Sequence, residues 1–440
     1  MRVHLRDGVA PREVLAWAFL DFANSGYTTV VLTAVYSAYF VGVIAGAASW
    51  ATLLWTLTVS GASFLTMLIL PSLGLWADQA GGKRAIIFWA SLLCGAATAA
   101  LAWVDANALW LAVSLVALSS LAFNLCETFT AAFLRELARP HAYGRVSGWG
   151  WSFGYLGGML TLGLSIAWVL HAKALGESAT QFVPVTLWIV AIVYVAVSLP
   201  ALAVLKERQG LASKDLLDDP QAPASAANGA DAWSGGWLRL RLSWQRTESL
   251  VDLRQLLVCC VAYHAGISVV ITLAAVYAEQ VMGFEPTDTM ILVFLVNIAA
   301  ALGAFFFGRF QDRMGGRLAL AITLVSWIVM VIVAVLGQSR ESFWLAATLA
   351  GLNMGSSQSA GRAMVAQLAP MGRQSEIFAL WGFALRLSAI LGPVLYGLLV
   401  WMSDGQQRLA LAFVGLFFVL SLWILSKINL QRGMQAARVA

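Results

Sequence analysis

The chain alternates long apolar runs with short polar turns, and this alternation constrains its fold more than any other feature. Twelve mostly apolar runs of about 20 residues are centred near positions 28, 62, 94, 120, 158, 193, 267, 298, 327, 353, 389 and 417. An α-helix of that length crosses the hydrocarbon core of a bilayer. Only 11% of the 440 residues are charged and 60% are hydrophobic, which leaves too little polar surface for a soluble globule. The sequence therefore predicts an all-α integral membrane protein with twelve transmembrane helices.

The basic residues lie mainly on one side of these predicted helices. If the N-terminus is cytoplasmic, 23 of the 27 Lys and Arg residues fall in cytoplasmic segments, three fall outside, and Arg386 lies within a span. Cytoplasmic loops of membrane proteins carry such an excess, so we expect both termini in the cytoplasm. The same excess explains the net charge of +5 without a nucleic-acid partner. Anionic membrane lipids are its expected counterpart.

A charged, glycine-rich turn occurs twice, 234 residues apart. The copies read Gly74-Leu-Trp-Ala-Asp78-Gln-Ala-Gly81-Gly82-Lys83-Arg84 and Gly308-Arg-Phe-Gln-Asp312-Arg313-Met-Gly315-Gly316-Arg317. Glycine permits the backbone angles of a tight turn, and aspartate can accept hydrogen bonds from the free amides that begin a neighbouring helix. Such a contact can break when the protein changes conformation; a static turn is the alternative. The candidate gating residues are Gly74, Asp78, Gly82, Lys83, Arg84, Gly308, Asp312, Arg313, Gly316 and Arg317.

The repeat indicates two related halves, residues 1–205 and 253–440, joined by a polar segment at 206–252. Carriers built from two repeats bind their substrates near the bilayer midplane, between the repeats. Residues 206–231 have the composition of a flexible tether. Residues 233–246 alternate Trp and Leu with Arg, which suits a segment at the anionic inner leaflet. A plain polar lead-in to the seventh span is the alternative.

Several motifs resemble those of a known family. The pattern Gly-x-x-x-Asp-Arg-x-Gly-x-Arg resembles the loop motif of the major facilitator superfamily, and Gln79 replaces the basic residue in the first copy, which predicts a weaker contact there. Other stretches resemble the vacuole-effluxer-like branch, whose fungal members are vacuolar amino-acid effluxers. They are Leu20-Asp-Phe-Ala-Asn-Ser-Gly-Tyr27, Gly144-Arg-Val-Ser-Gly-Trp-Gly150, Ser357-Gln-Ser-Ala-Gly-Arg362 and Leu391-Gly-Pro393. The resemblance implies a major-facilitator fold of two pseudo-symmetric six-helix bundles that works by alternating access.

Polar side chains inside the first and fourth spans are candidates for binding substrate or protons, because burying them in a bilayer is costly. Their spacing places them on one face of each helix. Asp21 either faces a central cavity or satisfies a neighbouring helix end. Glu127 either binds protons together with Asp21 or pairs permanently with Arg135 or another basic residue. The candidates in these two spans are Asp21, Asn24, Ser25, Thr28, Asn124 and Glu127.

The second half contributes further candidates. His264, in the seventh span, is either a hydrogen-bonded packing residue or a proton relay. Arg386 lies near the middle of the eleventh span and cannot lose its charge, so it needs an anion, either Glu127, Asp21 or a substrate group. Arg362 is expected at the inner interface, where snorkelling explains it. Asn353 and Ser357 form a polar patch nearer the middle of the membrane.

The sequence contains no pattern for metal binding, cofactor binding or nucleophilic catalysis, so we expect neither a metal nor a cofactor nor an enzymatic activity. We expect a secondary active transporter, functional as a monomer in a bacterial inner membrane. Its expected substrate is a small polar solute, such as an amino acid or another zwitterionic or anionic metabolite, with a proton as the candidate coupling ion. A multidrug or amphiphile exporter is one alternative. A non-transporting membrane receptor or assembly factor on a carrier fold is the other.

Overall fold

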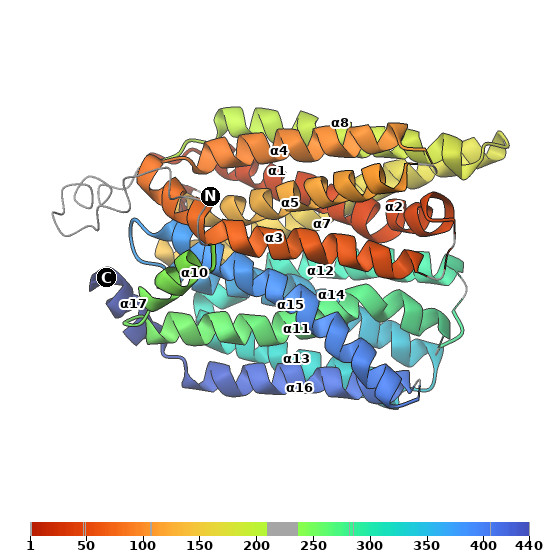
Figure 1. Cartoon of the computed structure of the whole chain (residues 1–440). Helices are drawn as coiled ribbons and strands as arrows, with labels where there is room; N and C mark the ends of the chain where they lie inside the picture. The colour runs from red at the N-terminus through yellow and green to blue at the C-terminus, as the bar shows by residue number, and fades with distance from the viewer. Residues whose placement is uncertain are drawn as a thin grey trace.

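The structure, a computed structural model, describes residues 2–46, 48, 50–105, 108–208, 236–280, 282–284, 286–404 and 406–439. Twelve long helices run side by side through this part of the chain (Figure 1). They are α1 (Pro11–Tyr27), α3 (Ala51–Ala80), α4 (Lys83–Ala100), α5 (Leu109–Ala132), α7 (Tyr143–Ala174), α8 (Ala179–Val204), α11 (Val251–Gln280), α12 (Pro286–Met314), α13 (Gly316–Leu336), α14 (Arg340–Leu368), α15 (Gln374–Met402) and α16 (Gln407–Lys427).

Shorter elements connect or extend these helices. They are η1 (Arg2–His4), the π-helices η2 (Thr28–Ala34) and η3 (Phe40–Ile44), α2 (Tyr36–Tyr39), η4 (Leu101–Trp103), α6 (Leu134–Leu137), η5 (Pro140–Ala142), α10 (Gly236–Gln245) and α17 (Leu430–Val439). The first span continues from α1 through η2, α2 and η3, so its helical path covers the 34 residues Pro11–Ile44. A single isolated β-bridge, between Leu5 and Ala138, is present in the described residues.

The protein is a multi-pass integral membrane protein. In the described part of the chain, eleven helices are long and apolar enough to cross a membrane. The remaining long helix, α14, has 29 residues and is more polar, and most of its side chains are buried within the bundle. A bilayer favours helices because each satisfies its own backbone hydrogen bonds. The long helices match the twelve apolar runs, which confirms the predicted all-α fold.

Glycines end the helices at both copies of the repeated turn. Gly81 follows α3 with φ of 65°, and Gly315 separates α12 from α13 with φ of 88°. These left-handed angles are readily adopted by glycine and strained for other residues. Each turn reverses the chain within two residues and returns it into the bundle, as the sequence predicts.

The two halves, α1–α8 and α11–α16, meet along two equivalent seams. In one seam α7 packs against α12 and α14, and in the other α3 packs against α15. The fifth long helix of each half therefore contacts the second long helix of the other half. Residues 209–235, which include most of the predicted tether, lie outside the described residues.

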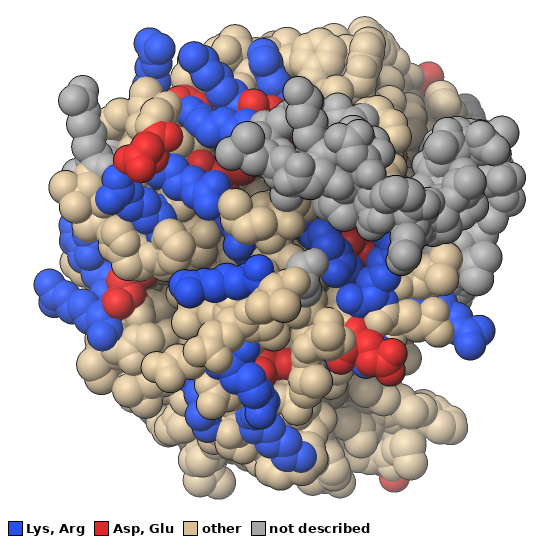
Figure 2. Space-filling model, turned by 90° about the vertical axis from the view of Figure 1, so that its left-hand side faces the viewer, with Lys and Arg blue, Asp and Glu red and all other residues tan. Residues whose placement is uncertain are grey.

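Both chain ends lie at the same end of the bundle, which we call the terminal face (Figure 1). α10 and α17 lie there too, and α10 packs against α3 and α15. Figure 2 looks onto this face and shows many Lys and Arg side chains spread across it. This arrangement matches the side of the predicted spans that carries most of the basic residues.

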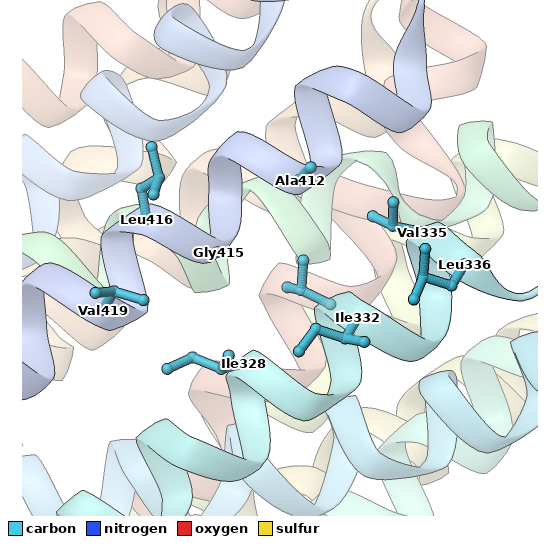
Figure 3. A pocket seen from close by; sticks show the side chains of 9 residues that line it. Ile328, Ile332, Val335, Leu336, Ala412, Gly415, Leu416 and Val419 are labelled. Atoms are coloured by element: carbon cyan, nitrogen blue, oxygen red, sulfur yellow. The ribbon is translucent and has the colours of Figure 1, made fainter.

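The outer surface of the bundle is apolar. Large exposed side chains such as Trp89, Trp110 and Trp423 lie along the outer helices, where lipid would contact them. Between α13 and α16 the surface has an apolar crevice of about 290 Å³. Figure 3 shows Ile332 and Leu416 on its opposite walls.

Candidate functional site

A cavity of about 690 Å³ lies between the two halves. Its walls come from α1, η2, α5 and α7 of the first half and from α11 to α16 of the second. Seven of the ten substrate- or proton-binding candidates line it together. They are Asp21, Asn24, Ser25, Thr28, Glu127, His264 and Arg386.

An ion pair joins the two halves on the side of the cavity nearer the terminal face. Arg362 of α14 donates from Nη1 to Oδ2 of Asp21 at 2.7 Å, and Asp21 belongs to α1. Arg362 also donates to the hydroxyl and the carbonyl oxygen of Ser147 in α7, at 3.0 and 2.7 Å. The Arg362 side chain is only 2% exposed. Removing either charge would leave the other buried without compensation, which is costly.

Aromatic and glycine residues shape the pocket around this ion pair. The Arg362 guanidinium lies 4.7 Å from the ring centre of Trp17 and 5.3 Å from that of Trp151, and both rings attract a cation. Gly150 supplies the remaining space, because a Cβ there would lie 2.5 Å from Asp21 Oδ2 and 2.6 Å from Arg362 Nη2. The ion pair is therefore enclosed on several sides and fixed in position.

The second ion pair is less enclosed. Arg386 of α15 donates to Glu127 of α5, so this pair also crosses between the halves. The Glu127 side chain is 22% exposed and that of Arg386 12%, and both line the cavity. The Nε of Arg386 is buried and has no hydrogen-bond partner among the described residues. Glu127 is therefore the anion that accompanies Arg386. The partner of Glu127 is Arg386 and not Arg135.

His264 lies in the cavity wall, on α11. It is 6% exposed, and its ring lies 4.4 Å from that of Tyr263. Its Nε2 has no hydrogen-bond partner among the described residues, although Ser268 and Thr272 line the same cavity further along the helix. His264 is thus a nearly buried polar group whose bonding capacity is left open at the cavity.

Two aspartates connect the halves at the terminal face. Asp78, at the end of α3, accepts hydrogen bonds from the backbone amides of Ser375 and Glu376, at 2.9 and 2.8 Å, in the first turn of α15. Asp312, at the end of α12, accepts from the amides of Gly144 and Arg145, at 2.9 and 3.1 Å, in the first turn of α7. Each carboxylate satisfies free amides and interacts favourably with the positive end of a helix dipole.

The other residues of the repeated turn fall into two groups. Gly74 and Gly308 allow the helices to approach across the seams, since a Cβ on Gly74 would lie 2.8 Å from the Ser375 carbonyl oxygen and one on Gly308 would meet the backbone of Gly144. The remaining residues make contacts within their own half. Lys83 pairs with Glu136, the Arg84 amide donates to Glu207, Arg317 donates to the Ser426 carbonyl oxygen, Gly82 packs against Trp76 and Gly316 against Met364. Arg313 shows no ion pair among the described residues.

Three of the candidates lie away from the cavity. Asn124 is buried and donates to Thr66 of α3 at 3.2 Å. Ser357 accepts from the Trp327 indole of α13 at 3.3 Å and donates to the carbonyl oxygen of Asn353. None of the three lines the cavity, and Asn353 is buried with no hydrogen-bond partner for its Nδ2 among the described residues.

Arg362 corrects one sequence-based interpretation. It was expected to snorkel to the interface, but it is buried and paired with Asp21. Sequence alone could not pair the two residues, because Asp21 lies on another helix, 341 positions away. Sequence reasoning also missed Tyr155, whose hydroxyl donates to Gln358 across the same seam, and the Trp17 ring. Trp151, whose sequence position allowed either cavity lining or packing, does line the cavity.

Comparison with solved structures shows the fold. The human organic anion transporter MFSD10 (TETRAN) is similar with a TM-score of 0.71 and 17% identity, covering 94% of this chain and 100% of the other. The proton:xylose symporter XylE gives a TM-score of 0.70 with 16% identity, covering 94% and 95%. Both belong to the major facilitator superfamily by fold, and this chain shares that fold.

Comparison with known sequences shows the family. An uncharacterized MFS-type transporter, YxiO of Bacillus subtilis (strain 168), is 24% identical over 418 residues, 93% of each chain. Autophagy-related protein 22 of Yarrowia lipolytica (strain CLIB 122 / E 150) is 25% identical over 330 residues, 70% of this chain and 54% of that protein. The chain thus spans about half the length of this fungal relative. Residues 37–438 match the family described as "Vacuole effluxer Atg22 like". The chain therefore belongs to the Atg22-like vacuole-effluxer family of major-facilitator transporters.

Proposed function

We propose that this transporter moves a small solute with an anionic or zwitterionic group, such as an amino acid, by alternating access. The observation that carries this proposal is the Glu127–Arg386 pair in the cavity wall, whose arginine keeps a buried Nε without a partner. A carboxylate can replace Glu127 on the guanidinium and form two parallel hydrogen bonds. An ammonium group on the same solute would compensate the released Glu127. No enzymatic activity is part of this proposal.

Arg386 suits substrate binding better than Arg362. Arg362 already donates to Asp21 and twice to Ser147 and lies close to two indole rings. Among the described residues, Arg386 has one carboxylate partner and one aromatic neighbour, Phe123, at 5.8 Å. A solute entering the cavity would have to displace several interactions at Arg362 but only one at Arg386. Arg362 therefore holds Asp21, and Arg386 contacts the solute.

The contacts at the terminal face define one state of the transport cycle. Asp78 and Asp312 hold the halves together there, while the cavity lining extends to Tyr277, Leu292 and Phe343 near the opposite ends of their helices. With the terminal face in the cytoplasm of a bacterial inner membrane, this state is open to the outside. Opening to the cytoplasm would break both aspartate contacts and the Asp21–Arg362 pair, because all three cross between the halves.

Asp21 and Glu127 are the candidates for proton coupling. Each pairs with an arginine of the other half, so each loses its partner when the halves separate. A carboxylate that loses an opposite charge in a poorly solvated cavity binds a proton more readily. Proton uptake would then follow the breaking of the pairs, and release would follow their re-formation.

Counterflow in proteoliposomes tests the proposal. The panel contains amino acids, organic acids and sugars. Vesicles are loaded with one unlabelled solute at a time and then exposed to the same solute in labelled form. We expect exchange with at least one amino acid or carboxylate, and loss of exchange in Arg386→Gln but not in Lys173→Gln, a matched loss of charge at the exposed end of α7. Exchange of sugars alone would contradict an anionic or zwitterionic substrate but would still agree with a carrier.

The outer part of the cavity supports the multidrug or amphiphile exporter as a second candidate. Aromatic and aliphatic residues, including Tyr277, Phe343, Tyr396 and Leu411, line it. Such a wall could hold the side chain of a large solute or an amphiphilic molecule. Competition by hydrophobic cations separates the two candidates. Such cations would inhibit an exporter of amphiphiles, whereas they would leave exchange by an amino-acid carrier unchanged.

A further inference from the structure

A tyrosine and a glutamine from opposite halves meet in the wall of the cavity. The hydroxyl of Tyr155 in α7 donates to Oε1 of Gln358 in α14. Both residues line the cavity and are nearly buried, with exposed fractions of 8% for Tyr155 and 9% for Gln358. The contact therefore holds the Gln358 side chain at the boundary between the packed seam and the cavity.

The contact also fixes the orientation of the Gln358 amide. A carboxamide accepts hydrogen bonds at its oxygen and donates two from its NH2 group. Tyr155 occupies the oxygen, and this is the one hydrogen bond that the Gln358 side chain makes among the described residues. Its Nε2 is not one of the enclosed atoms in that set that lack a partner. Because Gln358 lines the cavity, its NH2 group is a donor available to a molecule there.

A second unused donor lies close to Tyr155. The ring centres of Trp151 and Tyr155, one helical turn apart on α7, are separated by 6.0 Å. The indole Nε1 of Trp151 is buried without a hydrogen-bond partner among the described residues, and Trp151 lines the cavity. An indole N–H can only donate. Both halves thus carry an unused donor near Tyr155, which favours a solute with an oxygen atom that accepts.

The Gln358 amide lies at a depth comparable to that of Arg386. Gln358 lies ten residues before the end of α14 at Leu368. Arg386 lies twelve residues after the start of α15 at Gln374. These two helix ends are joined by the short connection 369–373 and so lie at the same face of the bundle. At a rise of 1.5 Å per residue, the two positions differ by about 3 Å in depth. A solute whose carboxylate binds Arg386 would therefore present its other end to Gln358 across the cavity.

We propose that Gln358 is a specificity residue of the cavity and that its NH2 group, oriented by Tyr155, donates to a neutral oxygen on the solute. Tyr155 is the positioning residue. The inference rests on the proposed function, in which the carboxylate of the solute binds Arg386 and its ammonium group compensates Glu127. A neutral oxygen suits the remaining contact because both charges of a zwitterion are then matched elsewhere. The solute class is an amino acid with a carboxamide side chain.

The donor favours such a solute over an apolar one of similar size. A solute with methylene groups in place of the carboxamide would leave the NH2 group of Gln358 without a partner in a cavity that it has filled. Glutamine and norleucine provide this comparison, because norleucine has an unbranched alkyl side chain of similar size.

Counterflow of labelled glutamine in proteoliposomes tests the assignment. Unlabelled glutamine and norleucine compete with the label, and the ratio of their half-inhibiting concentrations measures the selectivity. A change in the conformational equilibrium of the carrier alters the affinity for both competitors equally. The ratio therefore reports contacts with the side chain of the solute.

Three variants change the contact in different ways. Gln358→Met removes the amide at similar size, Gln358→Glu keeps an oxygen for Tyr155 but lacks the NH2 group, and Tyr155→Phe releases the amide. Tyr39→Phe is the control, because Tyr39 in α2 is also 8% exposed and is not a cavity-lining residue. Gln358→Glu and Tyr155→Phe keep the test available if Gln358→Met fails to fold.

We expect the parent to favour glutamine over norleucine by about 3- to 10-fold, the range for one hydrogen bond between neutral groups. Both Gln358 variants should lose this preference, Tyr155→Phe should reduce it, and Tyr39→Phe should keep it. Equal half-inhibiting concentrations in the parent, or an unchanged preference in both Gln358 variants, would overturn the assignment. A parent that exchanges another amino acid but not glutamine would overturn it too and leave the proposed function standing. A parent that exchanges neither amino acids nor carboxylates would overturn both.

Discussion

Asp78 and Asp312 make equivalent contacts from opposite halves of the protein. Each ends the second long helix of its half and accepts hydrogen bonds from two successive backbone amides that begin the fifth long helix of the other half. The distances are 2.8–2.9 Å for Asp78 and 2.9–3.1 Å for Asp312. Gln79 and Arg313 differ between the copies, but neither makes the contact across the seam.

Neutralising either aspartate should favour opening of the terminal face. Asp78→Asn and Asp312→Asn each weaken the interaction with a helix N-terminus by up to about 2 kcal/mol, enough to raise a minor open population roughly 5- to 30-fold. Spin labels at Gln79→Cys and Met371→Cys, both exposed, would report longer distances by electron paramagnetic resonance. Asp404→Asn, at an exposed position near the opposite end of α15, should leave the distances unchanged. Unchanged distances in both aspartate variants would mean that these contacts do not hold the face closed.

Removing one charge of the Asp21–Arg362 pair should cost much more than removing both. Asp21→Asn leaves a buried arginine uncompensated, which we expect to destabilise the protein by about 3–5 kcal/mol. The double variant Asp21→Asn with Arg362→Met should recover much of that loss. A double-mutant cycle from thermal unfolding measures the coupling, and additive effects would show that the two charges do not depend on each other.

Gly150→Ala should disturb this pair through space alone. Its Cβ would lie within 2.6 Å of atoms of both Asp21 and Arg362, and overpacking of this kind costs about 1–3 kcal/mol. Gly163→Ala on the same helix is the matched control, because a Cβ there meets no atom within 4 Å. The expected result is a lower melting temperature for Gly150→Ala only. Equal melting temperatures would argue against tight packing around the pair.

Glu127→Gln should separate substrate binding from proton coupling. Gln keeps the shape of the side chain but cannot bind or release a proton, so we expect uptake in the variant to vary less with pH than in the parent chain. Arg386→Gln should instead lower uptake at least tenfold at every pH, which corresponds to about 1.4 kcal/mol. Uptake measured between pH 5 and pH 8 distinguishes the two effects. A pH profile that is the same in Glu127→Gln and the parent would remove Glu127 as the coupling group.

Glu207 should make stability depend on pH outside the membrane. Burial raises the pKa of Glu207 above its ordinary value of 4.5, and hydrogen bonds from the amides of Lys83 and Arg84 only partly oppose this. The folded chain therefore binds more protons than the unfolded chain just above pH 4.5, so this contribution to stability is present below that pH and is lost as pH rises through the folded pKa. Melting temperatures of Glu207→Gln should fall less over that range than those of the parent. Glu248→Gln, at an exposed position, is the control, and parallel curves for all three proteins would contradict the assignment.

The spans were predictable because the bilayer imposes a simple length rule. Each apolar run had to form a helix of about 20 residues, and the positions of α3 to α16 follow from that rule. The turns at Asp78 and Asp312 were predictable as well, since glycine and aspartate have specific roles at helix ends. The partners of the two aspartates could not be predicted, because Ser375 and Gly144 are distant from them in the sequence.

The site was only partly predictable, because sequence periodicity shows that residues share a helix face but not which way that face points. Asp21 and Glu127 were placed on polar faces that do line the cavity. Asn353 and Ser357 share a face too, but neither lines the cavity, and Ser357 instead accepts a hydrogen bond from Trp327 of α13. Arg362 was misplaced for a related reason: its depth was known, while the neighbouring Asp21 that makes burial tolerable lies on another helix.

The two ion pairs give the cavity wall a balanced charge. Among the described lining residues, Asp21 and Glu127 offset Arg362 and Arg386, so the empty cavity holds as many negative as positive groups. A solute with one net charge would upset this electroneutrality in a space that water screens poorly. It would have to bring a compensating charge with it, either a second group of its own, as a zwitterion does, or an accompanying proton. On the proposed function, the wall would therefore discriminate among solutes by net charge before any individual hydrogen bond is formed.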